Sequence, residues 1–350
     1  MINTKFNINK LIRPNIKALQ PYSSARDEYK DTVDGMIFLD ANENPFENGV
    51  NRYPDPQQGN LKNVLAKLKG MSKQNILLGN GSDEVLDLIF RAFCEPNQDN
   101  VITLPPTYGM YEVLANTNAV DVIQIPLSEA FQPKVENILN KANTNSKLLF
   151  LCSPNNPTAN SFDKDKVELL IKDFQGIVVI DEAYIDFSEE ESWISRMNEF
   201  PNLIVTQTLS KAYGMAGIRL GICYASEEII AVLNKIKPPY NVNALTQKRA
   251  IEQLADNNLT EKQVGVLKIQ RELLKTELRA IDFIETIYPS DANFQLLKVD
   301  DANKRYSQLL EKGIVIRNRT TQPLCANCIR ITVGTEEENQ NLMTILKTLK

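Results

Sequence analysis

Strand-like and helix-like segments alternate along this chain of 350 residues up to about residue 240. Short apolar runs read as strands at 76–79, 100–104, 120–125, 147–152, 177–180, 203–208 and 219–224. Helix-like segments such as 82–93 and 163–174 separate several of them. Strands that are apolar along almost their whole length are typical of a parallel sheet with helices on both faces. The alternation therefore predicts an α/β fold with a mostly parallel central sheet.

The pattern changes after Pro238-Pro239-Tyr240. A long helical tract from about 246 to 280 follows, with a break expected at Asn257-Asn258. Further strand-like runs at 294–299, 314–317 and 329–333 are separated and followed by helix-like segments at 301–312 and from 336. A chain of this length is too long for one ordinary core, so we expect two domains. The expected division is an N-terminal arm (1–35), a large domain (36–245) and a smaller α+β domain (246–350).

Composition narrows the classes of function. The net charge of −5 implies no basic face, which argues against a nucleic-acid partner. Apolar residues make up 43% and charged residues 24% of the chain, as in ordinary globular proteins. No apolar run is long enough to cross a membrane or to form the core of a secretion signal. We therefore expect a cytoplasmic protein with no membrane partner.

The sequence contains no histidine. Histidine-ligated metals, Ser-His-Asp triads and Cys-His dyads are therefore excluded. The spacing of Cys325 and Cys328 is C-x-x-C, but zinc would need a second pair of ligands, so we expect no metal site and an incidental role for these thiols. Acid-base chemistry near neutral pH must then come from lysine, carboxylates, tyrosine or an organic cofactor.

Two strand ends carry groups that suit an anionic or polar ligand. After the run 76–79, a glycine turn leads into a helix that Ser82 or Asp83 could cap, and free N–H groups at a helix start bind anions. After the run 147–152, a proline-rich loop places Asn156 where α/β folds bind ligands, although Asn-Pro also occurs in plain turns.

Two later strand ends carry ionisable groups. Asp181 directly follows a buried strand, where a carboxylate needs a partner such as a protonated pyridine nitrogen, and Tyr184 lies three residues further on. Lys211 follows the run 203–208 among small residues, and partial desolvation there would lower its pKa as an imine-forming amine requires. Arg219 could pair with a phosphate through a bidentate fork.

In order, spacing and flanking residues, these segments resemble the fold-type-I aminotransferases that depend on pyridoxal 5'-phosphate (PLP). The likeness extends from the motif DANENP at 40–45 to RITVG at 330–334. Within that superfamily the chain most resembles the histidinol-phosphate aminotransferase family. The motifs that carry this likeness are NRYPDP at 51–56, PPTYGMY at 105–111 and CIRITVG at 328–334.

The resemblance implies roles for the residues that match. Lys211 is expected to hold the cofactor as a Schiff base and to move the proton. Asp181 is expected to keep the pyridine nitrogen protonated, so that the ring acts as an electron sink. Asn156 and Tyr184 match donors to the ring's phenolate oxygen, and Tyr108 matches the aromatic residue stacked on the ring.

Further positions follow from the same resemblance. The residues that match the phosphate cradle are Gly81, Ser82, Ser210 and Arg219. Tyr53 matches a tyrosine that reaches the cofactor of the neighbouring subunit, which implies a homodimer with shared active sites. The residues that match substrate ligands are Tyr22, Asn42, Arg317 and Arg330. One departure is Ala159, which stands where the family usually has glycine; if φ is positive there, alanine costs about 1 kcal/mol.

The expected reaction transfers the amino group of L-histidinol phosphate to 2-oxoglutarate. Other PLP enzymes on the same scaffold, such as threonine-phosphate decarboxylases and aromatic aminotransferases, share the lysine and the aspartate and stay open as alternatives. A PLP-sensing regulator is disfavoured, because those proteins carry a fused DNA-binding domain and the sequence has no segment that suits one.

Overall fold

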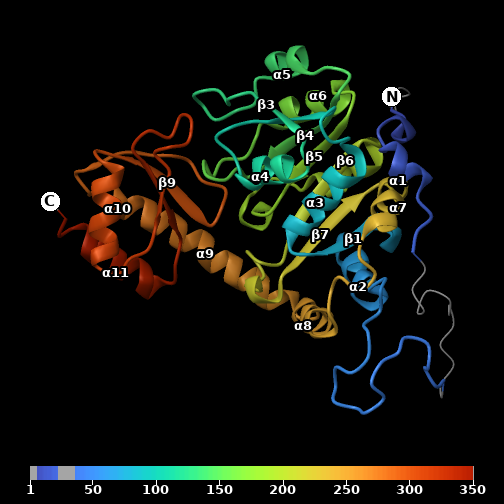
Figure 1. Ribbon diagram of the computed structural model, residues 1–350. Coiled ribbons are helices and arrows are strands. Elements are labelled where there is room, and N and C mark those ends of the chain that lie inside the picture. Colours follow the sequence, from blue (N-terminus) through green and yellow to red (C-terminus); the bar gives the residue numbers. More distant parts are fainter. Residues whose placement is uncertain (1–5, 23–35, 350) are drawn as a thin grey trace.

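The computed structural model describes residues 6–22 and 36–349. Its larger sheet has seven strands in the order β1-β7-β6-β5-β4-β2-β3 (Figure 1). These strands are β1 (Ile76–Asn80), β2 (Asn100–Thr103), β3 (Asp121–Gln124), β4 (Ser146–Cys152), β5 (Ile177–Asp181), β6 (Leu203–Thr208) and β7 (Leu220–Ala225). All seven match runs that the sequence predicts, with bounds that differ by one residue or so.

Most of the sheet is parallel, as the alternating pattern predicts. The strands β3, β2, β4, β5 and β6 pair in parallel, whereas β7 pairs antiparallel with both β6 and β1. The antiparallel strand β7 is the exception within this mostly parallel sheet. The reason is the short loop 209–219 between β6 and β7, since a parallel pair needs a long crossover.

Two apolar cores lie on the two faces of this sheet. In β4, Leu149 and Leu151 belong to one core, and Leu148 and Phe150 belong to the other, as strand alternation requires. The helices of the first core are α2 (Gly59–Lys69), α5 (Val135–Lys141) and α6 (Lys164–Asp173), with the 3-10 helix η5 (Trp193–Glu199). The helices of the second are α3 (Ser82–Phe93), α4 (Met110–Thr117) and α7 (Glu227–Ile236).

A second sheet forms near the C-terminus, with the antiparallel order β10-β11-β9-β8. Its strands are β8 (Ile284–Ile287), β9 (Phe294–Val299), β10 (Arg317–Asn318) and β11 (Cys328–Thr332). The helices α10 (Ala302–Glu311), α11 (Glu336–Leu346) and part of α9 (Asn257–Leu278) surround its own apolar core. The fold class is thereby confirmed: a mostly parallel α/β sheet with a smaller α+β unit. The sequence did not indicate β8.

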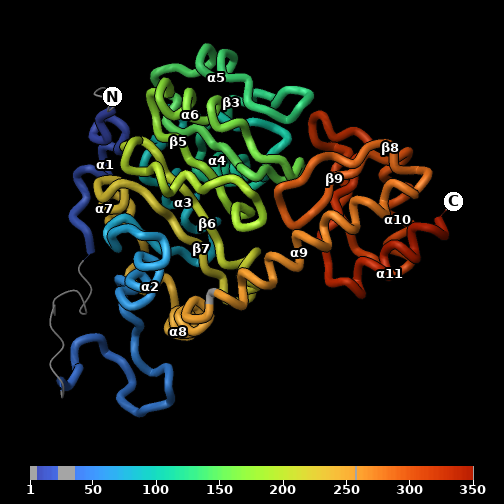
Figure 2. Tube along the Cα trace, turned by 180° about the vertical axis from the view of Figure 1, so that it is seen from behind, coloured from blue at the N-terminus to red at the C-terminus, as the bar shows by residue number. Residues whose placement is uncertain are grey.

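The helical tract before the second sheet is broken, as the sequence predicts. Helix α8 (Ala244–Leu254) ends just before α9 begins at Asn257. Helix α9 runs from the large sheet to the C-terminal unit in both views (Figures 1 and 2). The domain boundaries at 35 and 245 stay a prediction.

The N-terminal segments lie along the large sheet's helices. The short helix α1 (Pro14–Ala18) starts at a proline, and its Ile16 packs into the second core. Residues 36 to about 57 extend beyond α2, away from the sheet (Figure 2). Residues 1–5 and 23–35 of the expected arm lie outside the described residues. The remaining 3-10 helices are η1 (Ile8–Lys10), η3 (Lys73–Asn75), η4 (Ile185–Phe187) and η6 (Ala216–Ile218).

Candidate active site

The carboxyl ends of β4, β5 and β6 open into a cavity. Crevices at the carboxyl edge of an open α/β sheet are the usual ligand sites of such folds. The cavity is lined by eight residues that the sequence predicts for the site: Ser82, Tyr108, Asn156, Asp181, Tyr184, Ser210, Lys211 and Arg219. Segments that lie more than a hundred residues apart in the sequence therefore meet at one edge of the sheet.

Asp181 is the last residue of β5 and is 3% exposed. Its Oδ2 accepts a hydrogen bond from the Tyr111 phenol at 2.8 Å, and its Oδ1 accepts one from the backbone N–H of Ala183 at 3.2 Å. Burial raises the pKa of Asp181, and the hydrogen bond from Tyr111 opposes that rise. A buried carboxylate at a cavity wall favours a cationic ligand group, because the opposite charge offsets its desolvation.

Lys211 lies at the mouth of the same cavity and remains accessible to solvent. Partial burial is the largest cause of its lowered pKa, and the positive charge of Arg330 is the next. Its Nζ lies 5.7 Å from the centre of the Tyr184 ring. A lysine whose pKa is lowered has more neutral amine near pH 7, which is the nucleophilic form.

The turn before α3 forms an anion cradle. Gly81, with φ of 83°, is the N-cap of α3 and makes no side-chain cap, so the prediction that Ser82 or Asp83 caps this helix is wrong. Ser82 is instead the first helical residue, because the chain enters the helix through a conformation that only glycine adopts easily. The backbone N–H groups of this first turn are left without a side-chain acceptor, which suits an anion such as phosphate.

Two positions around the cradle, 81 and 221, need glycine because neighbouring atoms leave no room for a Cβ. A Cβ on Gly81 would lie 2.7 Å from Nη2 of Arg219, and a Cβ on Gly221 would lie 2.3 Å from the backbone N of Ser82. The strand β7 and the Arg219 guanidinium are therefore packed directly against the turn. This places a fixed positive charge beside the N–H groups at the start of α3.

Aromatic and amide groups form the rest of the wall. The Tyr108 phenol donates a 3.1 Å hydrogen bond to Asp83, and its ring meets the Tyr111 ring edge to face at 5.6 Å between centroids. Asn156 Nδ2 lies 3.5 Å from the Tyr184 hydroxyl. Arg330 donates a hydrogen bond from Nη1 to Asn156 Oδ1, which ties the second sheet to this wall.

Comparison with known proteins agrees with this geometry. The family model described as aminotransferase class I and II matches residues 38–346. The chain belongs to the class I and II aminotransferases.

Relatives of this aminotransferase are similar over almost their whole length. A histidinol-phosphate aminotransferase of Flavobacterium johnsoniae is 64% identical over 345 residues, which cover 98% of this chain and 99% of the relative. The crystal structure of the histidinol-phosphate aminotransferase from Clostridium acetobutylicum has a TM-score of 0.79 at 26% identity, covering 85% of this chain and 90% of that one. The enzyme from Sinorhizobium meliloti, solved in complex with pyridoxal-5'-phosphate, has a TM-score of 0.77 at 24% identity, with 85% and 84% covered.

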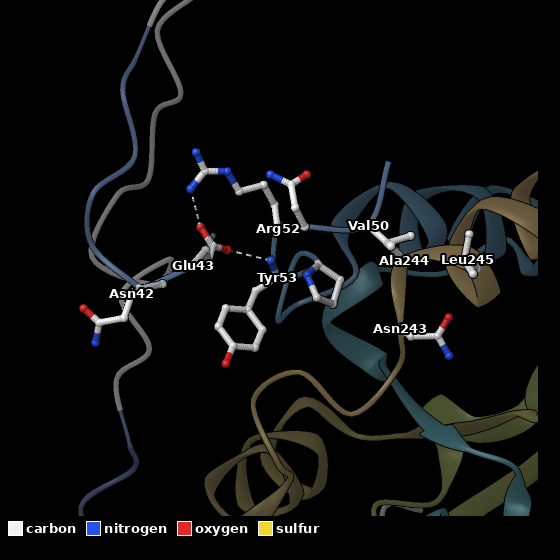
Figure 3. A pocket seen from close by; sticks show the side chains of 11 residues that line it. Asn42, Glu43, Val50, Arg52, Tyr53, Asn243, Ala244 and Leu245 are labelled. Carbon is white, nitrogen blue, oxygen red and sulfur yellow. Dashed lines mark hydrogen bonds and ion pairs between the residues drawn. The ribbon is translucent and has the colours of Figure 1, made fainter. Parts of the chain in front are cut away.

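Other predicted site residues of the aminotransferase lie outside the cavity. Asn42 and Tyr53 line a separate pocket with Asn243 to Leu245 on the opposite wall, and Glu43 accepts hydrogen bonds from Arg52 and from the Tyr53 backbone (Figure 3). Tyr22 is 76% exposed, and Arg317 is exposed on β10. The single chain thus brings eight of the residues predicted for the cofactor to one cavity, but places Tyr22, Asn42, Tyr53 and Arg317 outside that cavity.

Sequence reasoning did not assign several residues of the cavity region to the site. Tyr111 donates to Asp181, and the cavity lining also includes Asp83, Cys152 and Thr208. Tyr111 lies in the first turn of α4, whereas Tyr108 precedes that helix, and the two rings meet edge to face. The available signal for Tyr111 was its place in the motif PPTYGMY at 105–111.

Ala159 has a φ of 69°, so the condition under which alanine is strained is met. Its backbone is fixed by neighbours: its N–H donates to Asn155 O at 2.7 Å and its C=O accepts from the Asp291 N–H at 2.8 Å. The left-handed conformation costs alanine about 1–2 kcal/mol. Its side chain is fully buried, and a buried methyl returns about 0.8 kcal/mol, so the net cost of alanine is small.

The cavity fits pyridoxal phosphate on its own chemistry. The amine of Lys211 has a lowered pKa, and Asp181 is a buried carboxylate. The turn at Gly81 forms an anion cradle beside the Arg219 guanidinium. Among the residues that the structure describes, no group of three or more Cys, Asp and Glu could hold a metal ion. Within the same residues, no helix is both long and apolar enough to span a membrane.

Proposed function

We propose that this aminotransferase moves the amino group between L-histidinol phosphate and 2-oxoglutarate, giving imidazole-acetol phosphate and L-glutamate in histidine biosynthesis. Near full-length similarity carries the proposal: the Flavobacterium johnsoniae relative with this name is 64% identical over 98% of the chain. Pyridoxal phosphate is the cofactor, and when bound it supplies an electron sink for the carbon that loses its proton.

The chain's own residues then divide the work. Lys211 supplies the amine that holds the cofactor, and its lowered pKa leaves it able to accept and return a proton at Nζ. Asp181 holds a positive charge at the ring nitrogen, because a buried carboxylate is stabilised by a cation beside it. Tyr111 orients that carboxylate through its hydrogen bond.

The remaining cavity residues bind and orient. Asn156 and Tyr184 donate to the ring's oxygen, and Tyr108 stacks on the ring. Gly81, Ser82, Ser210 and Arg219 hold the cofactor's phosphate. Arg330 and Arg317, with Tyr22 and Asn42, hold the substrate's anionic group, which is a phosphate in histidinol phosphate and a carboxylate in glutamate.

A second copy of the chain completes the site in this proposal. The segment 36–57, which precedes α2 in the chain, exposes large apolar side chains: Ile37 is 84%, Leu39 87% and Phe46 80% accessible. Tyr53, which is 51% exposed, stacks on Tyr240 at 4.4 Å between centroids rather than lining the cavity. Burial of this segment against a partner would remove a large apolar surface from water and bring Tyr53 to the partner's cofactor. A homodimer in the cytoplasm, without nucleic-acid or membrane partners, is part of the proposal.

Threonine-phosphate decarboxylases and aromatic aminotransferases stay as alternatives on the same scaffold. The deciding experiment incubates purified holoenzyme with histidinol phosphate and 2-oxoglutarate and measures glutamate formation. Rapid glutamate formation supports the proposal. Carbon dioxide release from threonine phosphate, or faster turnover of an aromatic amino acid than of histidinol phosphate, would replace it.

A further inference from the structure

Three arginines share one face of the second sheet. Arg317 of β10 lies opposite Arg330 of β11 in the antiparallel register, so their side chains are on the same face. The ladder continues past β10, because the Arg319 N–H donates to Cys328 O at 2.8 Å. Arg319 is two residues beyond Arg317 and therefore returns to the same face.

That face is turned toward the cavity and away from the sheet's helices. Ile329 and Ile331, which alternate with Arg330 along β11, belong to the apolar core under α10 and α11. Arg330, on the other face, reaches Asn156 of the cavity wall and lies 5.1 Å over the Phe294 ring. Arg319 is half-buried on this side.

The three positive charges have no carboxylate partner among the ion pairs of the described residues. Burial and the neighbouring Arg319 lower the pKa of Arg330 to about 10. Burial and Arg317 likewise lower the pKa of Arg319, and Tyr184 of the cavity wall is among the groups that raise it. A bound anion stabilises such a cluster of guanidinium groups, because no carboxylate offsets their mutual repulsion.

Arg319 also carries an unsatisfied donor. Its Nε is buried and has no hydrogen-bond partner among the residues that the structure describes. A buried donor without an acceptor costs about 1–3 kcal/mol, so an acceptor from a ligand is expected there. A phosphate dianion has three terminal oxygens and two negative charges. A carboxylate has two oxygens and one negative charge.

We infer that Arg319 is a third arginine of the substrate site, and that it sets the preference for a phosphate-bearing amino donor over a carboxylate-bearing one. This inference rests on the proposed function, because it assigns the substrate's phosphate to the face formed by Arg317, Arg319 and Arg330. Arg319 adds a third positive charge and a planar set of N–H donors, which bind a phosphate dianion more strongly than a carboxylate. The carboxylate of glutamate carries one negative charge, and Arg330 and Arg317 are sufficient to bind it.

The experiment compares wild type with Arg319→Gln and Arg319→Lys as holoenzymes. The half-reactions of histidinol phosphate and of glutamate are measured separately by the change in cofactor absorbance. For Arg319→Gln, kcat/KM for histidinol phosphate should fall about 10- to 100-fold, as expected for a lost charge-assisted contact, while glutamate changes less than about threefold. Arg319→Lys should recover part of the loss, because it restores the charge but not the fork.

A matched control is Arg279→Gln, which removes an exposed arginine that follows α9, in the same unit of the chain. It should leave both half-reactions unchanged. An equal loss on both donors in Arg319→Gln, or no loss on either, would overturn the role of Arg319.

A separate measurement keeps this inference apart from the identity of the substrate. Inorganic phosphate should inhibit the glutamate half-reaction of the wild-type holoenzyme, and Arg319→Gln should weaken that inhibition about 10-fold or more. If wild type fails to use histidinol phosphate but phosphate inhibition still depends on Arg319, the proposed function fails and the phosphate site stands. Phosphate inhibition that is the same in wild type and Arg319→Gln overturns the site.

Discussion

The Tyr111 phenol donates a 2.8 Å hydrogen bond to Oδ2 of Asp181 at the buried end of β5. Both groups lie deep in the sheet: Tyr111 is fully buried and Asp181 is 3% exposed. The hydrogen bond lowers the pKa of Asp181 while burial raises it. Tyr111 therefore helps to keep a charged carboxylate where the ring nitrogen of the cofactor is proposed to lie.

Replacing Asp181 tests this charge directly. Asp181→Asn keeps the shape but removes the charge, so kcat should fall on the order of 1000-fold while cofactor remains bound. Tyr111→Phe removes only the hydrogen bond and should cost about 10-fold. Steady-state kinetics with cofactor content from absorbance provide the measurement. Near-normal turnover of Asp181→Asn would mean that Asp181 is purely structural.

The neighbouring carboxylate supplies the control. Glu182 is equally buried but accepts hydrogen bonds from Ser192, the Trp193 N–H and Gln207, and it does not line the cavity. Glu182→Gln should lower the free energy of unfolding, because those donors lose a charged acceptor. The kcat of the folded enzyme should stay within about threefold of wild type, as expected for a group that makes no contact in the site.

The attachment point of the cofactor is tested by chemical trapping. Borohydride reduction of the holoenzyme, digestion and mass spectrometry should find the pyridoxyl group on Lys211, and Lys211→Ala should carry none. The reason is that Lys211 is the lysine of the cavity lining and has a lowered pKa. A pyridoxyl group on any other lysine of wild type would contradict the assignment.

The sequence predicts the sheet, and it predicts the residues that line the cavity, because both depend on local patterns. Each buried strand is a continuous apolar run, and Asn156, Asp181 and Lys211 follow such runs, so topology brings them together. Long-range packing was not predictable in the same way. The Gly81 cap depends on a contact with Arg219 that no local pattern encodes, whereas the reversal of β7 agrees with the short interval between the runs 203–208 and 219–224.

The residues predicted to bind substrate show a further limit of prediction from sequence. Arg319 stands beside Arg317 in a segment that reads as loop, and only the register with Cys328 and Arg330 places it on the same face. Tyr53 and Asn42 lie outside the cavity of one chain, so no pattern within a single chain can bring them to it. The roles predicted for Tyr53 and Asn42 therefore require the homodimer that we propose.

The pH dependence of cofactor attachment follows from the charges around Lys211. Attachment needs the neutral amine, so the rate for the apoenzyme should rise with pH through a pKa below 10.5. Arg330 lowers that pKa, so Arg330→Gln should move the midpoint to higher pH. Arg317→Gln is the control and should move the midpoint less, because Arg317 is not among the main charges that shift the pKa of Lys211. Stopped-flow absorbance measures the rate; a midpoint that is the same in wild type and Arg330→Gln would contradict this coupling.

The proposed sharing of active sites between two subunits predicts complementation. Tyr53→Ala and Lys211→Ala enzymes should each be weak, and their mixture should regain activity. A mixed dimer has one site with Lys211 from one subunit and Tyr53 from the other, so random exchange restores about a quarter of the wild-type sites. The measurement is activity after exchange confirmed by differential tagging. No recovery from an impaired Tyr53→Ala enzyme would place Tyr53 at the site of its own chain.

Substitution of the two arginines predicted from the sequence tests how one pocket holds two anions. The same position must take a phosphate in one half-reaction and a carboxylate in the other, and a guanidinium pairs bidentately with either. Arg330 is half-buried and also holds Asn156, so Arg330→Ala should reduce kcat/KM about 10- to 150-fold with both amino donors.

Arg317 is exposed on the neighbouring strand and makes no such contact with the cavity wall. Arg317→Ala should therefore damage the reaction of histidinol phosphate more than that of glutamate, because a dianion uses a second arginine better than a single carboxylate does. Wild type should also prefer histidinol phosphate strongly to histidinol, which lacks the anion. The measurement is kcat/KM for each donor in wild type and both variants. Equal use of histidinol and its phosphate by wild type would remove the phosphate from the pocket and favour an aromatic aminotransferase.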